Sequence, residues 1–334
     1  MEYRKIQKTG GATFAVTLPK PWARKAGLRA GDLVGLQAQG DGTLVLTPGR
    51  PGRRENGRGT TARIRLAEES RDELQRRVIA AYLAGFDLVE IESPRIRPAE
   101  RALVRELVRR LMGAEIIEET SDRIVVQDLA DTSEFDMRRG VRRMSRVARS
   151  MHEDAMKAIA DSDAELGRDV EGRDDELDRL YWLVNKQYHL VLRNPRAAEG
   201  MGVTGTTGLG FLLVGRILER IGDHAARMAQ TVPTLAGSRI PPAILEELRE
   251  ASAVSLSIVQ EAVEALYGED FERANVAIRR SKELSAIKKD LLGRLVKLRP
   301  EIVLPLTLVL ESIERTGNYG TDIGEIAINH LYAK

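Results

Sequence analysis

Two pairs of carboxylates are the residues of this sequence with the clearest capacity for chemistry. Asp174 and Asp178 are four residues apart, and so are Glu219 and Asp223. Residues at this spacing lie on one face of an α-helix, about one turn apart. If the two helices face each other in a bundle, four carboxylates converge and can share a divalent or trivalent metal ion. Iron, manganese, zinc and magnesium are the candidates.

A repeat within the chain supports the metal hypothesis. Acidic pairs are usually a solvated face in a chain in which 31% of residues are charged. Here, however, the segment Leu218-Glu-Arg-Ile-Gly-Asp223 has a counterpart, Ile313-Glu-Arg-Thr-Gly-Asn318. Similarity within one chain indicates two copies of one structural unit.

Long helices are predicted to position these residues. Their expected ranges are 133–161, 171–193, 208–231, 241–267, 270–298 and 304–332, with Ser133 capping the first. In the third helix, the helical spacing of Leu209, Leu213, Ile217 and Ile221 predicts the buried face. Six helices in two sets of three predict tandem three-helix bundles at 132–235 and 240–334.

The N-terminal part predicts a small β and α/β region. Residues 1–48 read as four short strands with one helix at 19–27. Residues 49–60 form a basic linker that includes Arg50, Arg53, Arg54 and Arg58. Residues 61–130 alternate strand and helix, with helices that end at Gly85 and Gly113, and are interpreted as a spacer or interaction module. The predicted fold class is therefore mainly α, with a small β and α/β N-terminal part.

Composition excludes several classes of site. The 334-residue chain has no cysteine, so disulfides and thiolate metal sites are excluded. It has no run of eighteen apolar residues and no signal peptide at its start, so we expect a cytoplasmic protein without membrane insertion. No nucleophile with a base beside it can be identified, and we expect no enzyme.

The first 48 residues resemble the AbrB/SpoVT family. The resemblance rests on Arg4-Lys-Ile, Val16-Thr-Leu-Pro19, Ala26-Gly-Leu-Arg-Ala-Gly-Asp32 and Leu44-Val-Leu-Thr-Pro48. It implies that two chains interleave their hairpins into one DNA-binding homodimer. The basic residues that would contact DNA are Arg4, Lys5, Lys8, Arg24 and Lys25. Ala12 and Ala23 stand where the family often has arginine, and a head that only dimerises is the alternative.

Residues 132–332 resemble the PhoU family of phosphate-uptake regulators, through Leu218-Glu-Arg-Ile-Gly-Asp-His224 above all. Together with the AbrB-like residues 1–48, here called the head, the whole chain is similar to archaeal PhoU-like proteins that fuse the two. The resemblance implies a metal cluster on each bundle. The first site keeps Asp174, Asp178, Glu219 and Asp223. The second keeps Glu314 and Asp322 but has Asn318, and it has serines in Ser281-Lys-Glu-Leu-Ser285 where acids would be, so we expect it to be degraded.

Three functions remain open at this point. The first is a DNA-binding, metal-dependent phosphate regulator. The second is an adaptor that restrains a phosphate transporter or signalling protein. The third, a di-metal enzyme, is disfavoured because no Glu-x-x-His pair is present. His224 is a further candidate ligand, or a histidine satisfied within the bundle. The glycine-rich segment 200–210 is a phosphate cradle or, preferably, a flexible connection between helices.

Overall fold

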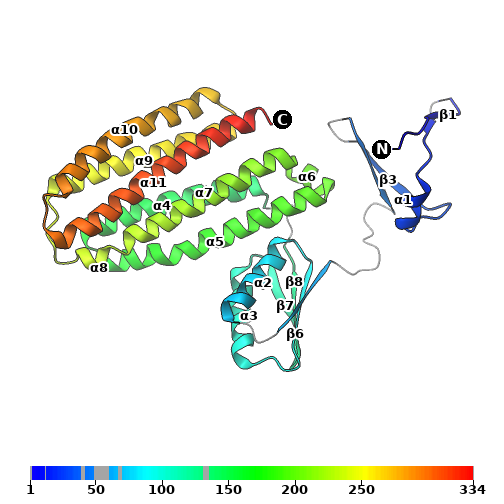
Figure 1. Ribbon diagram of the computed structural model, residues 1–334, viewed down its shortest axis with the longest axis horizontal. Helices are drawn as coiled ribbons and strands as arrows, with labels where there is room; N and C mark the ends of the chain where they lie inside the picture. Colours follow the sequence, from blue (N-terminus) through cyan, green and yellow to red (C-terminus); the bar gives the residue numbers. More distant parts are fainter. Residues whose placement is uncertain are drawn as a thin grey trace. The chain divides into compact units, whose positions relative to one another are not determined.

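A computed structural model describes residues 2–11, 13–38, 42–48, 60–66, 70–130 and 135–333. The chain forms two compact units, Met1–Gly59 and Thr60–Lys334, which are described separately (Figure 1). The arginines of the predicted linker and the predicted cap Ser133 lie outside the described residues.

The N-terminal unit consists of two hairpins and one helix, in the predicted order. Strands β1 (Gln7–Thr9) and β2 (Thr13–Ala15) pair antiparallel, as do β3 (Val34–Ala38) and β4 (Leu44–Pro48). Helix α1 (Lys20–Lys25) lies between the hairpins in sequence and has a proline in its first turn. None of the residues whose burial is described in this unit is buried. The unit therefore has no core of its own within one chain.

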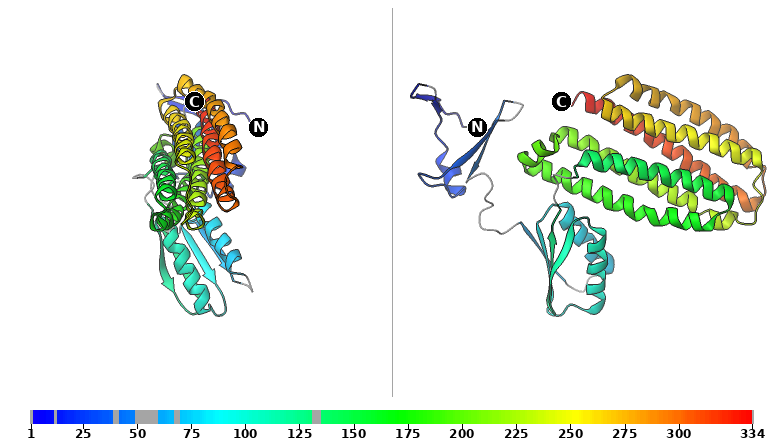
Figure 2. Two further views of the ribbon diagram at one scale, coloured as in Figure 1. Left: turned by 90° about the vertical axis from the view of Figure 1, so that its left-hand side faces the viewer. Right: turned by 180° about the vertical axis from the view of Figure 1, so that it is seen from behind.

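The second unit begins with a two-layer α/β part. Its elements are β5 (Thr61–Arg65), α2 (Arg71–Leu83), β6 (Leu88–Glu92), α3 (Pro98–Arg110), β7 (Ala114–Glu119) and β8 (Arg123–Asp128). The sheet order is β5-β6-β8-β7, with only the β5–β6 pair parallel. Both helices lie on one face of the sheet, where Ile91, Val104 and Ile124 form the centre of the core (Figures 1 and 2).

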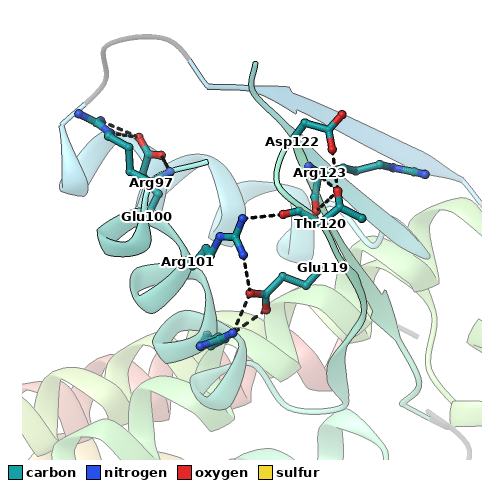
Figure 3. Close-up of polar contacts among 8 residues, drawn as sticks. Arg97, Glu100, Arg101, Glu119, Thr120, Asp122 and Arg123 are labelled. Carbon is teal, nitrogen blue, oxygen red and sulfur yellow. Dashed lines mark hydrogen bonds and ion pairs between the residues drawn. The ribbon is translucent and has the colours of Figure 1, made fainter. Parts of the chain in front are cut away.

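Local signals account for the ends of these elements. Ser70 caps α2 in a reciprocal pair with Glu73. Gly85 and Gly113 follow α2 and α3 with φ of 71° and 78°, as the predicted helix ends require. Glu119 on β7 accepts hydrogen bonds from two arginines of α3, Arg101 and Arg105, and so ties this helix to the sheet (Figure 3).

The rest of the unit is helical and forms two three-helix bundles with one continuous core. The helices are α4 (Met137–Asp161), α5 (Ala164–Arg193), α6 (Pro195–Met201), α7 (Gly205–Ala229), α8 (Val232–Leu235), α9 (Pro242–Gly268), α10 (Phe271–Leu295) and α11 (Pro300–Leu331). The first bundle contains α4, α5 and α7, and the second contains α9, α10 and α11. Helix α7 packs beside α11, and α4 contacts α9 (Figure 1).

Three predicted helix starts were wrong by four residues or more. Helix α11 begins at Pro300 rather than at 304, with a proline in its first turn. Helix α4 begins at Met137, because the side chain of Asp136 accepts a hydrogen bond from the Arg139 amide and caps it. Helix α5 begins at Ala164 rather than at 171, because Asp163 caps it through the amides of Glu165 and Leu166.

The predicted buried face of α7 was also partly wrong. Leu209 and Leu213 are 41% and 44% exposed, whereas Phe211, Val214 and Leu218 are buried. The reason is that α7 packs against α4, α5 and α11 at once. Its buried surface is therefore broader than one apolar stripe, and it is rotated away from these two leucines.

Candidate functional site

The two acidic pairs of the first bundle lie on α5 (Asp174 and Asp178) and on α7 (Glu219 and Asp223), and these two helices approach each other closely. A Cβ atom on Gly222 would lie 2.2 Å from Leu177 Cδ1 and 3.5 Å from Asp174 Oδ1. A glycine at this position leaves room for the Leu177 side chain between the two closely packed helices. The glycine of the repeated motif thus places Asp174 against the turn of α7 that carries Glu219 and Asp223.

Burial and mutual repulsion perturb these acids. Burial first, and then the Asp223 and Asp178 charges, raise the pKa of Asp174 to about 6. Burial first, and then Asp223, raise the pKa of Glu219 to about 7. Burial also raises the pKa of Asp178, although Arg110 opposes the shift. The four predicted acids therefore act on one another electrostatically.

Two arginines hold part of this acidic group. Arg216 donates to Glu219 Oε1 at 2.7 Å, and Arg110 donates to Asp178 Oδ2 at 3.2 Å. Glu219 Oε2 is buried and has no hydrogen-bond partner. No three Asp, Glu or His side chains in the described part of the chain are grouped so as to hold a metal as they stand.

The chemistry of these four carboxylates, though not their present placement, is that of a site for a hard metal ion. They supply oxygen ligands of the kind that such cations prefer, and they include the unpartnered buried oxygen of Glu219. Binding would require Asp178 and Glu219 to turn from the arginines toward the ion.

The corresponding position in the second bundle has the same packing but different chemistry. A Cβ atom on Gly317 would lie 2.2 Å from Leu284 Cδ2, which matches the contact between Gly222 and Leu177. The hydroxyls of Ser281 and Ser285 donate to carbonyl groups of their own helix. The repeat therefore extends to the packing of the helices, and it replaces the aspartates of α5 with serines.

In the second bundle, a lysine pairs with the glutamate that corresponds to Glu219. Lys288 Nζ lies 2.5 Å from Glu314 Oε2. Asp322, one turn after Asn318, has a pKa raised by burial and by Glu325. Of the two acids predicted here, Glu314 is therefore neutralised by a side chain, and the charge that acts on Asp322 is that of Glu325 on its own helix.

His224 faces the second bundle. Its Nδ1 lies 3.3 Å from Ser312 Oγ, and its ring packs against Tyr319. His152 is fully buried at the same junction, with Nε2 3.0 Å from Ser252 Oγ. These contacts support the interpretation of His224 as a histidine satisfied within the helical core.

The two histidines predict how stability depends on pH. Burial first lowers the pKa of both His152 and His224 to about 4, below the unfolded value of about 6.5. The unfolded state then binds more protons between these values, so stability falls as the pH drops from about 6.5 to about 4. We expect His152→Gln to flatten the urea-midpoint curve over this interval. An unchanged slope would contradict this prediction.

The five predicted DNA-binding residues are all exposed, but they are not in one element. Lys8 lies in β1, Arg4 and Lys5 precede it, and Arg24 and Lys25 form the last turn of α1. Arg4 pairs with Glu2.

The interpretation of residues 200–210 as a connection was partly wrong. Residues 205–210 already belong to α7, whose N-terminus is closed by the pair Thr204 and Thr207. A Cβ atom on Gly208 would lie 3.3 Å from Tyr188, and one on Gly210 would lie 2.9 Å from His330. These glycines allow close packing of side chains on the helix rather than forming a phosphate cradle.

Four ion pairs at or near the two candidate sites were missed from sequence, including the pair between Lys186 and Asp128. They are made by the cations Arg110, Lys186, Arg216 and Lys288. Only the pair between Arg216 and Glu219 has a local signal, because these residues are three apart on one helix. The others join residues that are 26 to 68 positions apart, and no spacing rule indicates them.

Comparisons with known proteins agree with this geometry. The PhoU domain profile matches residues 141–232 and 248–327, which together are slightly more than half of the chain. The profile of the MazE antitoxin, described as antidote-toxin recognition, matches residues 7–54. The head is therefore of the MazE/AbrB type.

Individual relatives show the same extent of similarity. The chain is 27% identical to a phosphate-specific transport system accessory protein PhoU homolog of Rhizobium meliloti, over 56% of this chain and 80% of that one. It is 25% identical to the homolog of Pseudomonas aeruginosa, over 58% and 81%.

The crystal structure of PhoU from Pseudomonas aeruginosa matches in fold with a TM-score of 0.54 at 24% identity. The match covers 61% of this chain and 99% of that one. The duplicated bundles, the repeated glycine contact and the profile match together place this chain in the PhoU domain family.

Proposed function

We propose that this protein regulates phosphate uptake as a DNA-binding homodimer whose first PhoU bundle binds a metal ion. The observation that carries the proposal is the combination of two PhoU bundles with a MazE/AbrB-type head in one chain. The relatives are named as accessory proteins of phosphate-specific transport systems. No helix in the described part of this chain has the length and hydropathy needed to cross a membrane.

Homodimerisation is supported by the exposed apolar side chains of the head. Tyr3, Ile6, Phe14 and Leu36 are between 66% and 84% exposed. Such a unit cannot offset the loss of chain entropy without a partner that buries these side chains. A second copy, with its hairpins interleaved, supplies that partner and doubles the number of basic residues that face DNA.

The metal part of the proposal predicts a change in thermal stability. A cation that binds only the folded state stabilises it by about 2.7 kcal/mol at a hundredfold excess over the dissociation constant. We expect manganese(II) to raise the melting temperature of the wild-type chain and to have no effect on the double variant Asp178→Asn, Asp223→Asn. The double variant should melt at or above the wild-type temperature in chelator, because repulsion between the acids is relieved.

The matched control is Asp322→Asn, which removes one acid from the second bundle. This variant should keep most of the response to manganese(II), since Lys288 already neutralises Glu314 there. A wild-type melting temperature that is the same in chelator and in manganese(II) would contradict the metal site.

A second candidate function is an adaptor that restrains a phosphate transporter, with a head that only dimerises. The relatives' names favour it as much as they favour regulation. Full-length Arg24→Ala, Lys25→Ala separates the two functions in cells that lack the native gene. Loss of phosphate-dependent control of uptake in this variant supports DNA binding. Full control by the variant supports the adaptor.

A further inference from the structure

We propose that Arg110 of the α/β part competes with the metal ion for Asp178, so that metal binding loosens the contact between the α/β part and the first bundle. This inference rests on the metal site of the proposed function. It assigns to residues 60–130 a role in regulating that site, which the sequence interpreted only as a spacer or interaction module.

The contact joins the last turn of α3 to the metal-motif face of α5. Arg110 Nη2 donates to Asp175 Oδ1 at 2.7 Å and to Asp178 Oδ2 at 3.2 Å. The guanidinium also lies over the ring of Trp182, 5.1 Å from its centroid. One arginine from the α/β part therefore occupies one of the four predicted metal ligands and stacks on the next turn of the same helix.

The arginine and a metal ion exclude each other by charge. A cation shared by Asp174, Asp178, Glu219 and Asp223 would draw on the carboxylate of Asp178, whose Oδ2 Arg110 now engages. It would also place at least two positive charges beside the guanidinium, in a partly buried position where screening by water is weak. The Nε of Arg110 is buried without a partner, so the present contact does not satisfy all of the donors of Arg110.

In the second bundle, the cation that pairs with an acid belongs to the bundle itself. There Lys288 neutralises Glu314 from α10, within the same bundle. In the first bundle the cation at Asp178 comes instead from another part of the unit, and it can leave without unfolding a helix of the bundle. Glu219, the counterpart of Glu314, also pairs with a cation of its own bundle, Arg216, so the exchange with a metal ion concerns Arg110 at Asp178.

A separate contact keeps the α/β part attached when Arg110 leaves. Lys186 of α5 is 3% exposed and donates to both carboxylate oxygens of Asp128, at 2.8 Å each. Its ammonium also lies 4.5 Å from the ring centroid of Tyr82. Metal binding would therefore loosen the α3 end of this contact while the Lys186 end holds.

The test measures zinc(II) affinity and the environment of Trp182 in the full-length chain. By calorimetry we expect Arg110→Gln to bind zinc(II) about tenfold more tightly than the wild type, because a competing cation has been removed. The control Arg109→Gln changes the charge of the neighbouring exposed residue on α3 and should bind like the wild type.

The second measurement is the fluorescence of Trp182, which can be recorded with Arg110 in place. The chain has two tryptophans, so Trp22→Phe leaves Trp182 as the only tryptophan, which is excited selectively at wavelengths where tyrosine does not absorb. Zinc(II) should shift the emission of Trp182 when Arg110 leaves the ring, and the shift should disappear when Arg110→Gln is added.

Two results would overturn the inference. One refutes only the competition by Arg110, and the other also refutes the metal site of the proposed function. If Arg110→Gln and the wild type bind zinc(II) equally while Asp178→Asn abolishes binding, the metal site stands and the competition is refuted. If neither the wild type nor Arg110→Gln binds zinc(II), and manganese(II) also leaves the wild-type melting temperature unchanged, the metal part of the proposed function fails as well.

Discussion

Replacement of Gly320 by alanine is expected to destabilise the helical unit by about 2–3 kcal/mol, through overpacking. Gly320 lies on α11, where a Cβ atom would be 2.8 Å from the backbone nitrogen of Val259 and 3.1 Å from the backbone carbon of Ile258. A flexible side chain could move aside, but the backbone of the buried helix α9 cannot. Helices α9 and α11 would have to separate and lose core contacts.

The matched control is Gly293→Ala on α10. No atom lies within 4 Å of a Cβ built on Gly293, so this change should stabilise the helix by about 0.5–1 kcal/mol through propensity alone. Urea unfolding of the two full-length variants measures the difference. If both midpoints moved in the same direction, the close approach at Gly320 would not limit the packing of α11 on α9.

Periodicity and repetition were sufficient to predict most of the fold. The long amphipathic segments and the echo between Gly222 and Gly317 predicted two similar bundles, because both are local properties of the chain. The repeated glycine even marks an equivalent close contact in each bundle. The short strands of the head were predictable from their alternation for the same reason.

Features that depend on packing between elements could not be predicted in this way. The exposed Leu209 and Leu213 satisfy a helical pattern, but the neighbours of α7 determine which of its faces is buried. Lys288 stands one turn beyond the serines where ligands were sought, so its pairing with Glu314 depends on the register of α10 against α11.

The predicted acids of the first site illustrate both cases. That they lie near enough to perturb one another's pKa agrees with the spacing of four residues and with the repeat. The arginine that holds Asp178 could not be inferred, because Arg110 belongs to a different part of the chain and no sequence pattern brings α3 to α5. Acids that share one helix face are therefore more predictable than the cations that pair with them from elsewhere in the chain.

If the proposed homodimer contacts DNA phosphates through the five basic residues of each head, its DNA affinity is expected to fall by about 10⁵-fold between 50 and 200 mM salt. All five residues are exposed, and a dimer presents ten of them. Each neutralised phosphate releases counterions and contributes about −0.9 to the slope of log affinity against log salt. The total slope should therefore be about −9 if every contact forms.

Arg24→Ala with Lys25→Ala tests this prediction on the full-length chain. The double variant removes two contacts per head, so the slope should become less steep by about 3.6 in the dimer, with a similar loss of affinity for all DNA sequences. Arg29→Ala removes the same kind of charge from an exposed residue outside the predicted set and should leave the slope unchanged. Affinity measured by fluorescence anisotropy over a salt series gives both slopes. An affinity that does not change with salt, or equal effects of the two variants, would show that the head joins two chains without contacting phosphates through α1.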